Sequence, residues 1–308
     1  MSERANERVA WFNGSFMPES RVQVPFRDRS FIYGDGAFDM TRTFARRIFK
    51  LDEHLTRFYR SLKYLRIDPG IGPKELAEVT MEVLERNLHL LGPDEDYWVA
   101  QRVSRGVKSF EGDGVEHHGP NVIVECSPLP LGERASLYRD GIRVTVPSVR
   151  RVPPESLTPR AKTHNYLNLI VGDQEAQARD PGSWAVLLDV NGNLCEGLGS
   201  NIFLVQDGEL LTPREKLVLA GVSRATVIEL AAELGIACHQ TDLDLYDAYT
   251  ADEAFLTSTS LCICPIASVN GQRIGAGRPF GPVTRRLTDA YIRLVDCDFV
   301  EQYLQRLS

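Results

Sequence analysis

A short break in the middle of the chain constrains the possible folds more than any other feature. It is the run Arg150-Arg151-Val152-Pro153-Pro154-Glu155-Ser156, which indicates an interdomain linker or a crossing segment. Strand-like and helix-like stretches alternate on both sides of it, and a chain of 308 residues is long enough for two domains. We therefore predict an α+β protein of two subdomains, with mixed sheets flanked by helices. The expected division is a smaller domain at residues 1–149, a linker at 150–157 and a larger domain at 158–308.

The first part of the chain begins with a hairpin signal. Residues 9–12 and 15–17 flank Asn13-Gly14, the strongest short signal for two antiparallel strands joined by a tight turn. We predict strands and turns up to residue 50. The elements expected after them are a helix from Asp52, a second helix at about 73–91, and strands near 97–104, 121–126 and 141–149.

A polar, glycine-rich stretch from Glu111 to Gly119 contains the adjacent pair His117 and His118. Histidines are common metal ligands, but glycines and charged residues surround this pair. We therefore favour a mobile loop here over a metal site, and we predict no metal centre.

The second part of the chain continues the alternation. A helix follows Lys162 and carries the apolar residues Leu167, Ile170 and Val171. The later elements that we predict are strands at 184–189, 201–205, 254–257 and 265–269, a helix at 222–234, and an amphipathic helix from near Val283.

The composition argues against several classes of function. The net charge of -7 argues against a nucleic-acid partner, because phosphate binding needs a basic surface. The polar first residues lack the apolar core of a signal peptide, and no apolar run approaches the ~18 residues that a membrane helix needs. The six cysteines lack zinc-finger spacing, so we expect reduced and mostly buried thiols. These observations predict a cytoplasmic protein with no membrane partner.

Four features could carry chemistry, and each has an ordinary alternative. Lys162 at the mouth of a helix is, taken alone, more often a solvated charge than a reactive amine. Ser223 follows a glycine turn that leads into a helix, so it is either an N-cap or part of a phosphate site. The four hydroxyls of Thr257–Ser260 form either a polar turn or a site for a phosphate or carboxylate. Arg57 is either a surface arginine, the more common case, or a phosphate clamp.

Together with Glu196, these features describe a site for one ligand. Pyridoxal phosphate needs a lysine that forms an imine, an acid beside its pyridine nitrogen, and a separate cup for its phosphate. Lys162 and Glu196 match the first two needs, and Arg57, Ser223 and the hydroxyls of Thr257–Ser260 match the third. The sequence thus predicts pyridoxal 5'-phosphate as a cofactor.

The same residues stand in the order of a known family. The chain resembles the class IV aminotransferases, which are fold-type IV pyridoxal-phosphate enzymes. This family includes branched-chain aminotransferases, D-amino-acid aminotransferases, (R)-selective amine transaminases and aminodeoxychorismate lyase. The resemblance covers nearly the whole chain. The motifs that carry it are Tyr33-Gly34-Asp35-Gly36, Leu51–Arg57, Lys162 with Asn165-Tyr166-Leu167, Glu196–Phe203, Thr212-Pro213, Gly221–Arg224 and Gly281–Thr284.

The resemblance implies a role for each matched residue. Lys162 would form the Schiff base and carry the proton, and Glu196 would keep the pyridine nitrogen protonated. Tyr166 would face the phenolate side of the cofactor. The implied phosphate ligands are Arg57, the backbone of Val222 and Ser223, and Thr259. The turn Ser260-Leu261 would receive the substrate carboxylate.

The substrate side departs from the family patterns. Branched-chain enzymes usually carry Phe-Glu-Gly where this chain has Phe38-Asp39-Met40, so Met40 would fill part of a pocket. Trp98 and Ala100 stand where those enzymes carry Tyr-x-Arg-Pro, so the arginine on the carboxylate side is absent. The Pro-Arg-x-His clamp of the D-amino-acid enzymes is also missing after Ser104-Arg105-Gly106, and Arg105 is either structural or a carboxylate anchor. The residues expected to line the substrate site are Tyr33, Phe38, Met40, Trp98, Arg105, Ser260 and Leu261.

We therefore predict a transaminase that moves an amino group to a 2-oxo acid from an apolar, branched-chain-like amino acid or an (R)-amine. Two alternatives stay open at this point. One is a lyase that uses the same lysine and expels pyruvate from an aminodeoxychorismate-type substrate. The other is a non-catalytic binding protein on the same fold, which would hold no cofactor. The resemblance further implies a homodimer.

Overall fold

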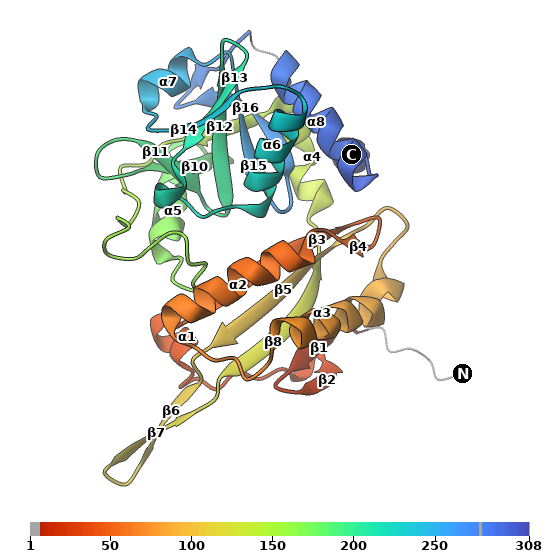
Figure 1. The fold of residues 1–308 in the computed structure, drawn as a ribbon, viewed down its shortest axis with the longest axis vertical. Coiled ribbons are helices and arrows are strands. Elements are labelled where there is room, and N and C mark those ends of the chain that lie inside the picture. Colours follow the sequence, from red (N-terminus) through yellow and green to blue (C-terminus); the bar gives the residue numbers. More distant parts are fainter. Residues whose placement is uncertain (1–6, 277–278, 308) are drawn as a thin grey trace. The chain divides into compact units, whose positions relative to one another are not determined.

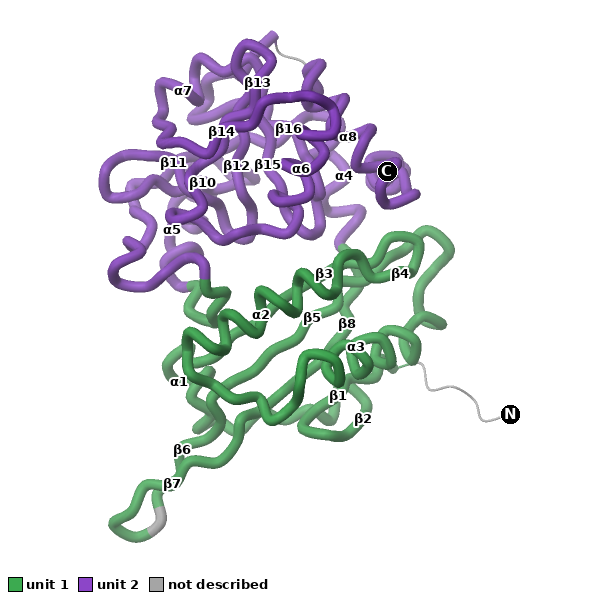
Figure 2. The backbone as a smooth tube through the Cα atoms, viewed as in Figure 1, with its two compact units in different colours: residues 1–129, 161–166 green, residues 130–160, 167–308 purple. Residues whose placement is uncertain are grey.

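Contacts within the chain divide it into two units, which the computed structural model describes over residues 7–276 and 279–307 (Figure 1). Unit 1 runs to Leu129 and also includes Ala161–Tyr166, whereas unit 2 comprises Pro130–Arg160 and the chain from Leu167 onward (Figure 2). Both units combine helices with a large sheet, as expected for an α+β protein.

Unit 1 is built on an antiparallel sheet of six strands. In spatial order they are β2 (Ser15–Pro18), β1 (Val9–Phe12), β8 (Asn121–Pro128), β5 (Tyr97–Ser104), β3 (Gly36–Phe44) and β4 (Arg47–Ile48). The predicted hairpin at Asn13-Gly14 is confirmed, because β1 and β2 pair on either side of it. The remaining elements of the unit are η1 (Glu19–Arg21), α1 (Arg29–Tyr33), α2 (Leu51–Leu65), α3 (Pro73–Asn87), η2 (Leu88–Leu90), β6 (Val107–Glu111) and β7 (Gly114–His118).

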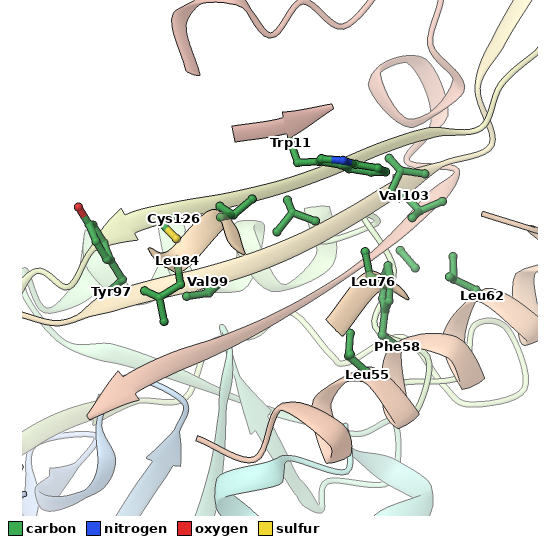
Figure 3. Close-up of a cluster of buried hydrophobic side chains, with 14 of the residues drawn as sticks. Trp11, Leu55, Phe58, Leu62, Leu76, Leu84, Tyr97, Val99, Val103 and Cys126 are labelled. Carbon is green, nitrogen blue, oxygen red and sulfur yellow. The ribbon is translucent and has the colours of Figure 1, made fainter. Parts of the chain in front are cut away.

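The two long helices of unit 1 cover one face of this sheet (Figure 1, Figure 3). The apolar stripes predicted from Asp52 onward and at 73–91 lie in α2 and α3, and both point into a shared core. The core combines Leu55, Phe58, Leu62, Leu76 and Leu84 of the helices with Ala37, Val99, Val103, Val122 and Val124 of the strands. Because side chains alternate along a strand, Phe38, Met40, Trp98, Ala100 and Arg102 face the other side of the sheet.

Two predictions for unit 1 are wrong. Residues 111–119 do not form a loop, because β6 and β7 pair from Val107–His118 to Glu111–Gly114. A hairpin is held by backbone hydrogen bonds, so the glycines and charged residues that suggested a loop can also form paired strands. The second wrong prediction is that only strands and turns occur up to residue 50, because residues 29–33 form the short helix α1. Asp28 caps this helix by accepting a hydrogen bond from the Ser30 amide at 2.7 Å.

The segment around Lys162 also differs from its prediction. Residues 161–164 are extended and lie along the start of β3, with Ala37 opposite Thr163. The Phe38 amide donates to the Lys162 carbonyl at 3.1 Å, and the His164 amide donates to the Gly36 carbonyl at 2.9 Å. Lys162 is therefore part of the unit 1 sheet and does not lie at a helix mouth.

The helix that follows is α5 (Leu167–Arg179), and its predicted apolar stripe is on the wrong face. Leu167, Ile170 and Val171 are exposed, whereas Leu169 and the small residues Gly172 and Ala176 face the sheet of unit 2. A Cβ on Gly172 would come within 2.9 Å of a Leu187 methyl carbon, so small residues set how closely this helix approaches its sheet.

Unit 2 is built on a mixed sheet of nine strands. The path runs β11 (Leu194–Gly197), β10 (Trp184–Leu188), β9 (Ile142–Thr145), β16 (Cys262–Val269), β15 (Glu253–Ser258), β12 (Ser200–Gln206), β13 (Glu209–Pro213) and β14 (Cys238–Thr241), with β17 (Gln272–Arg273) beside β16. An extra pairing of β11 with β12 closes part of this path into a ring. The helices are α4 (Leu131–Asp140), α5, η3 (Glu215–Leu217), α6 (Val222–Glu233), α7 (Leu245–Thr250), α8 (Pro282–Val295) and α9 (Phe299–Leu304).

The division into units differs from the expected domain boundary. Strand β9 pairs in parallel with β10 and β16, so residues 142–145 belong to the sheet of unit 2. The proline-containing run at 150–157 therefore lies inside unit 2. Parallel pairing joins residues far apart in the sequence, and no local composition signal marks it.

All six cysteines have free thiols, and four of them are buried. Within residues 7–276 and 279–307 no helix is both long enough and apolar enough to cross a membrane. The same residues contain no group of three or more acidic, histidine or cysteine side chains that could hold a metal ion.

A first prediction concerns the pairing that places Lys162. A Cβ at Gly36 would lie 2.6 Å from the Val103 carbonyl oxygen and 2.6 Å from His164 Nδ1. We expect Gly36→Ala to lower the free energy of unfolding by about 1–3 kcal/mol, because the Val103 carbonyl belongs to a paired strand and cannot move away from the new Cβ. Urea denaturation measures this loss.

The matched control is Gly132→Ala in α4, where a new Cβ would meet no atom within 4 Å. Alanine favours a helix over glycine, so this variant is expected to be as stable as the wild type or slightly more stable. Equal stability of both variants would contradict the steric argument.

Candidate active site

The Lys162 side chain lies among aromatic rings in unit 1. It is 9% exposed, and its Nζ donates a hydrogen bond to the Tyr166 hydroxyl at 2.8 Å. The same Nζ lies 4.5 Å from the centroid of the Phe38 ring and 5.3 Å from that of Tyr166. The alternative of a solvated lysine is thus wrong for this side chain, because aromatic surface replaces most of its water.

The backbone on both sides of Lys162 is held by hydrogen bonds. Its amide donates to Ser61 Oγ at 3.0 Å, and Ser61 Oγ donates to the Arg57 carbonyl at 3.0 Å within α2. Together with the pairing to β3, these bonds attach the lysine to two elements of unit 1. The amine is therefore presented from a rigid backbone.

Arg57 forms a buried charge cluster with Asp39 and His54. Asp39 is fully buried on β3, and its carboxylate accepts from Arg57 Nε at 2.9 Å, from Arg57 Nη2 at 2.7 Å and from His54 Nδ1 at 2.7 Å. Burial opposes ionisation of Asp39, but the charge of Arg57 and the hydrogen bond from His54 outweigh it and hold the Asp39 pKa well below its usual range. Burial also lowers the pKa of His54, so this ring is a neutral donor.

The cluster excludes one of the two alternatives for Arg57. Its side chain is 11% exposed and is clamped by a bidentate ion pair, so it is not a solvated surface arginine. Asp39 and His54 were not among the predicted site residues. The spacing of His54 and Arg57, one helical turn apart, placed them on one face of α2, but only the alternation of β3 turns Asp39 toward that face.

In unit 2, Glu196 is buried and its two carboxylate oxygens have different partners. Oε1 accepts from Arg151 Nε at 3.0 Å, and Oε2 accepts from the Leu219 amide at 2.9 Å. Arg151 is oriented in turn by Asn168, whose Oδ1 accepts from Arg151 Nη1 at 3.3 Å. A guanidinium and an amide N–H both favour the ionised carboxylate, so this arrangement suits a carboxylate that stabilises a neighbouring cation.

Sequence reasoning missed Arg151, because it lies in the run that was assigned to a linker. Its position in the fold follows from the hydrogen bond between its amide and the Leu188 carbonyl at 2.8 Å. A pair of arginines before two prolines carries no local sign of this contact.

The start of α6 forms a second polar feature of unit 2. Val222 and Ser223 are its first residues, and Ser223 Oγ donates to the Ser258 carbonyl at 3.0 Å. Gly221 precedes them, and a Cβ there would lie 2.2 Å from Asn201 Oδ1. The Ser223 side chain does not cap the helix, so the alternative of an N-cap is wrong. No side chain at the cap position accepts from the first N–H groups of α6.

Two buried hydroxyls lie on strands next to Asn201, the residue that Gly221 approaches at the start of α6. Thr257 lies opposite Asn201 across β15 and β12, and Ser200 precedes Asn201. Within the described part of the chain, Ser200 Oγ and Thr257 Oγ1 are buried without a hydrogen-bond partner. Buried polar atoms in native proteins are ordinarily hydrogen-bonded, so both groups indicate a place for a polar ligand.

The Thr257–Ser260 run ends in a turn held by helices on two sides. Ser260 Oγ accepts from Arg134 Nη1 at 2.5 Å, and the Ser260 carbonyl accepts from the Tyr303 hydroxyl at 3.0 Å. Tyr138 donates to the Leu261 carbonyl, and the Leu261 amide donates to Ser258 Oγ at 3.0 Å. Thr259 is half-buried on the same turn, so this turn is a fixed polar surface and not a flexible loop.

Four of the remaining residues expected at the substrate site lie in two places in unit 1. Phe38, Met40 and Trp98 share the sheet face of unit 1 that lies opposite the α2–α3 core. Tyr33 is exposed at the end of α1, with the guanidinium of Arg29 5.4 Å from its ring centroid.

Arg105 has a structural geometry. It makes a bidentate pair with Asp35, at 2.8 Å and 3.1 Å, and donates to the carbonyls of Leu65 and Arg66 at the end of α2. These bonds use every nitrogen of its guanidinium, which favours the structural role over that of a carboxylate anchor.

The model of the amino-transferase class IV family matches residues 36–269. A Methanocaldococcus jannaschii protein, whose name assigns it provisionally as a branched-chain-amino-acid aminotransferase, is 36% identical over 285 residues that cover 91% of this chain and 94% of that protein. The branched-chain-amino-acid aminotransferase of Escherichia coli is 31% identical over 290 residues, which cover 92% of each chain.

Solved structures agree with the sequence relatives. A crystal structure of the Escherichia coli branched-chain amino acid aminotransferase matches with a TM-score of 0.85 at 30% identity and covers 94% of this chain and 95% of that one. The T.th. branched-chain amino acid aminotransferase, solved with pyridoxamine 5'-phosphate, matches with a TM-score of 0.83 at 30% identity and covers 94% of each chain. The predicted fold-type IV architecture is confirmed.

This chain belongs to the class IV aminotransferase family and is a transaminase. Class IV aminotransferases are pyridoxal-phosphate enzymes, and a matching structure carries pyridoxamine 5'-phosphate.

A second prediction concerns His164, whose ring stacks on Phe38 with 5.7 Å between centroids and contacts Ser30 through Nδ1. Burial lowers the pKa of His164 from 6.5 to about 4. The unfolded chain therefore binds this proton at a higher pH than the folded chain, and the stability contributed by neutral His164 is present above pH 6.5 and lost as the pH falls toward 4. The loss amounts to about 3 kcal/mol at the acid end of the window.

We expect His164→Gln to flatten the dependence of the urea-unfolding midpoint on pH between 6.5 and 4. His54 titrates in both proteins, so its contribution cancels when the slopes are compared. Parallel slopes for wild type and variant would show that His164 is not the group responsible.

Proposed function

We propose that this chain is a pyridoxal-5'-phosphate-dependent transaminase with Lys162 as its reactive amine. The observation that carries the proposal is the Lys162 Nζ, held 2.8 Å from the Tyr166 hydroxyl on a backbone that pairs with β3. A nucleophilic amine must be presented in a fixed direction, and the surrounding aromatic rings reduce its contact with water. The class IV family membership supports the same assignment.

The polar groups of unit 2 fit the needs of such a cofactor. The buried hydroxyls of Ser200 and Thr257 have no partner in the described structure, and the free N–H groups at the start of α6 suit a phosphate. In unit 2, the residues that would hold the phosphate are Val222 and Ser223, through their backbone, and Thr259. Arg57 is proposed as a further phosphate ligand on the family resemblance alone. When bound, the cofactor supplies a carbonyl carbon that receives the amino group and a ring that withdraws electrons from it.

The residues of the chain then act on protons and charges. Lys162 Nζ would take a proton from the substrate carbon that bears the amino group and deliver it to the cofactor carbon that receives this group, in the same half-reaction. The Tyr166 hydroxyl orients Nζ. Glu196, which Arg151 and the Leu219 amide hold in place, would stabilise a positive charge on the pyridine nitrogen of the cofactor. The turn at Ser260-Leu261 positions the substrate carboxylate.

For the substrate, we propose an apolar amino donor, either a branched-chain-like amino acid or an (R)-amine, and a 2-oxo acid acceptor. Phe38, Met40 and Trp98 support this choice, because they give one sheet face of unit 1 an apolar surface. The names of the relatives support branched-chain donors in particular. The alternative of an aminodeoxychorismate-type lyase uses the same lysine and is separated from transamination by its product.

We also propose that the protein is a cytoplasmic homodimer. Exposed apolar side chains gather over residues 24–33, namely Val24, Phe26, Phe31, Ile32 and Tyr33. A cluster of this kind on a monomer ordinarily marks a surface for a protein partner.

A third prediction tests the reactive amine. We expect Lys162→Ala to remove the near-visible absorbance band that the purified protein shows with its cofactor and to reduce turnover at least about 10³-fold, because no other amine replaces the nucleophile. Absorbance spectra and a coupled assay measure the two effects. The control is Lys216→Ala, since Lys216 is exposed and pairs only with Glu155 at 3.5 Å among the described residues.

An active Lys162→Ala variant would overturn the assignment. A wild-type protein that stays colourless in the presence of pyridoxal phosphate would instead support the non-catalytic alternative.

A fourth prediction concerns the donor. We expect L-leucine or (R)-1-phenylethylamine to react at least about tenfold faster than D-alanine with 2-oxoglutarate or pyruvate as acceptor, because an apolar pocket favours the larger apolar group. Formation of glutamate or alanine measures transamination. Release of pyruvate from an aminodeoxychorismate-type substrate without any acceptor would support the lyase.

A further inference from the structure

A row of side chains crosses one sheet face of unit 1 beside Lys162. The Phe38 amide donates to the Lys162 carbonyl, so these two residues lie opposite each other. Phe38 in turn lies opposite Arg102 on β5. Because directly opposed residues point to the same face, Lys162, Phe38 and Arg102 form one row across three neighbouring strands.

Both cations of this row contact the same ring. The Lys162 Nζ lies 4.5 Å from the Phe38 centroid, and the Arg102 guanidinium carbon lies 5.4 Å from it. A second positive charge thus stands on the sheet face that carries Lys162.

Arg102 is held in place by Glu125 of β8. Its Nε and Nη2 both lie 2.9 Å from the same oxygen, Glu125 Oε1. The Arg102 side chain is 35% exposed, and within the described residues its guanidinium has no other hydrogen-bond partner. Nη1 is therefore open to an incoming acceptor while the other two nitrogens orient the group.

Arg102 lies close to the position of a missing arginine. Ala100, where branched-chain enzymes carry an arginine, is buried between Met40 and Glu125 and offers no charge. Arg102 stands two residues further along β5, and residues two apart on a strand share a face.

Distance selects which carboxylate such an arginine would bind. Neighbouring strands lie about 4.8 Å apart, so Lys162 and Arg102 are separated by about 10 Å at their backbones. Both side chains leave the same face and reach the same Phe38 ring, so their charged ends can be separated by up to about the same distance. In an extended five-carbon dicarboxylic amino acid the amine and the far carboxyl carbon are about 5 Å apart, and a guanidinium adds about 4 Å to its ion-paired carboxyl carbon. The carboxylate next to the amine would fall short of this span.

We propose that Arg102 is a specificity-determining residue that binds the side-chain carboxylate of a five-carbon dicarboxylic substrate, as in glutamate or 2-oxoglutarate. The proposal rests on the proposed transamination, and it assigns the acceptor side of that reaction. Glu125 orients the guanidinium and at the same time competes with the substrate for its charge.

The competing explanation is an ion pair with no role beyond structure. A partly exposed pair of this kind contributes about 0–1 kcal/mol to stability, so its removal leaves the fold intact and substrate effects can be measured. The two explanations differ in their prediction for Glu125. If the pair is only structural, removing either partner has the same effect, whereas competition predicts opposite effects.

The experiment compares Arg102→Leu and Glu125→Gln in the holoenzyme. Two non-reacting probes, glutarate with two carboxylates and 4-methylvalerate with one, are titrated by calorimetry. The kcat/KM for 2-oxoglutarate and for 4-methyl-2-oxopentanoate is measured with one common donor. The matched control is Arg86→Leu on α3, since Arg86 also pairs with a glutamate, Glu82 at 2.5 Å, and also stacks on a ring, Phe16 at 4.1 Å.

We expect Arg102→Leu to raise the Kd of glutarate and to lower kcat/KM for 2-oxoglutarate by about 10- to 100-fold, the effect of a lost charged hydrogen bond. The monocarboxylates should change by less than about twofold, and Glu125→Gln should tighten glutarate by about two- to fivefold. Arg86→Leu should behave as the wild type.

Three results would overturn the proposal. They are an unchanged glutarate affinity in Arg102→Leu, an equal loss for both probes, and a loss in Glu125→Gln that matches the loss in Arg102→Leu. Failure of the proposed function is a separate result, namely no amino transfer by the wild type to any acceptor. Glutarate binding is measured without turnover, so the two failures are distinguishable.

Discussion

The pairing of residues 161–164 with the first residues of β3 is the constraint on which the candidate site depends. Two backbone hydrogen bonds join Lys162 and His164 to Phe38 and Gly36, and they bring a segment from the middle of the chain back into the sheet of unit 1. The pairing sets which way each side chain points. Lys162 shares a face with Phe38, whereas Asp39, the next residue of β3, faces α2. A shift of one residue in this register would turn the amine toward the core.

Each of the two buried carboxylates near the site has a positively charged partner. Asp39 is paired with Arg57 and His54, and Glu196 is paired with Arg151 and the Leu219 amide. Both carboxylates are thereby fixed in direction, and the pKa of Asp39 is held low enough to keep it ionised. Arg102 differs from these groups, because it is partly exposed and has one partner on one side. A guanidinium in that state can exchange or share its partner with a substrate.

Much of the architecture follows from local patterns. The Asn13-Gly14 hairpin, the stripes of α2 and α3, and the glycine turn before α6 are visible because turn chemistry and period-two or helical spacing act over a few residues. Most failures occur where pairing is decided at long range: β9 joins unit 2 by parallel pairing, and Arg151 reaches Glu196 from a run that resembles a linker. The β6–β7 hairpin is a local failure, because its polar, glycine-containing residues resemble those of a loop. Residues such as Asp39 and His54 carry no local sign of their contact.

The amino-acid sequence by itself determined the family, because Lys162, Glu196, Ser223 and the glycines around them recur as a set whose order no single motif could imitate. It also determined which residue types are available, among them the alanine at position 100. Only the tertiary structure decided how they are used. It showed that Lys162 pairs with β3 and does not lie at a helix mouth, it gave Arg57 and Arg105 their carboxylate partners, and it placed Arg102 in one row with Lys162. The physical reason is that strand register sets side-chain neighbours, and register joins residues far apart in the chain.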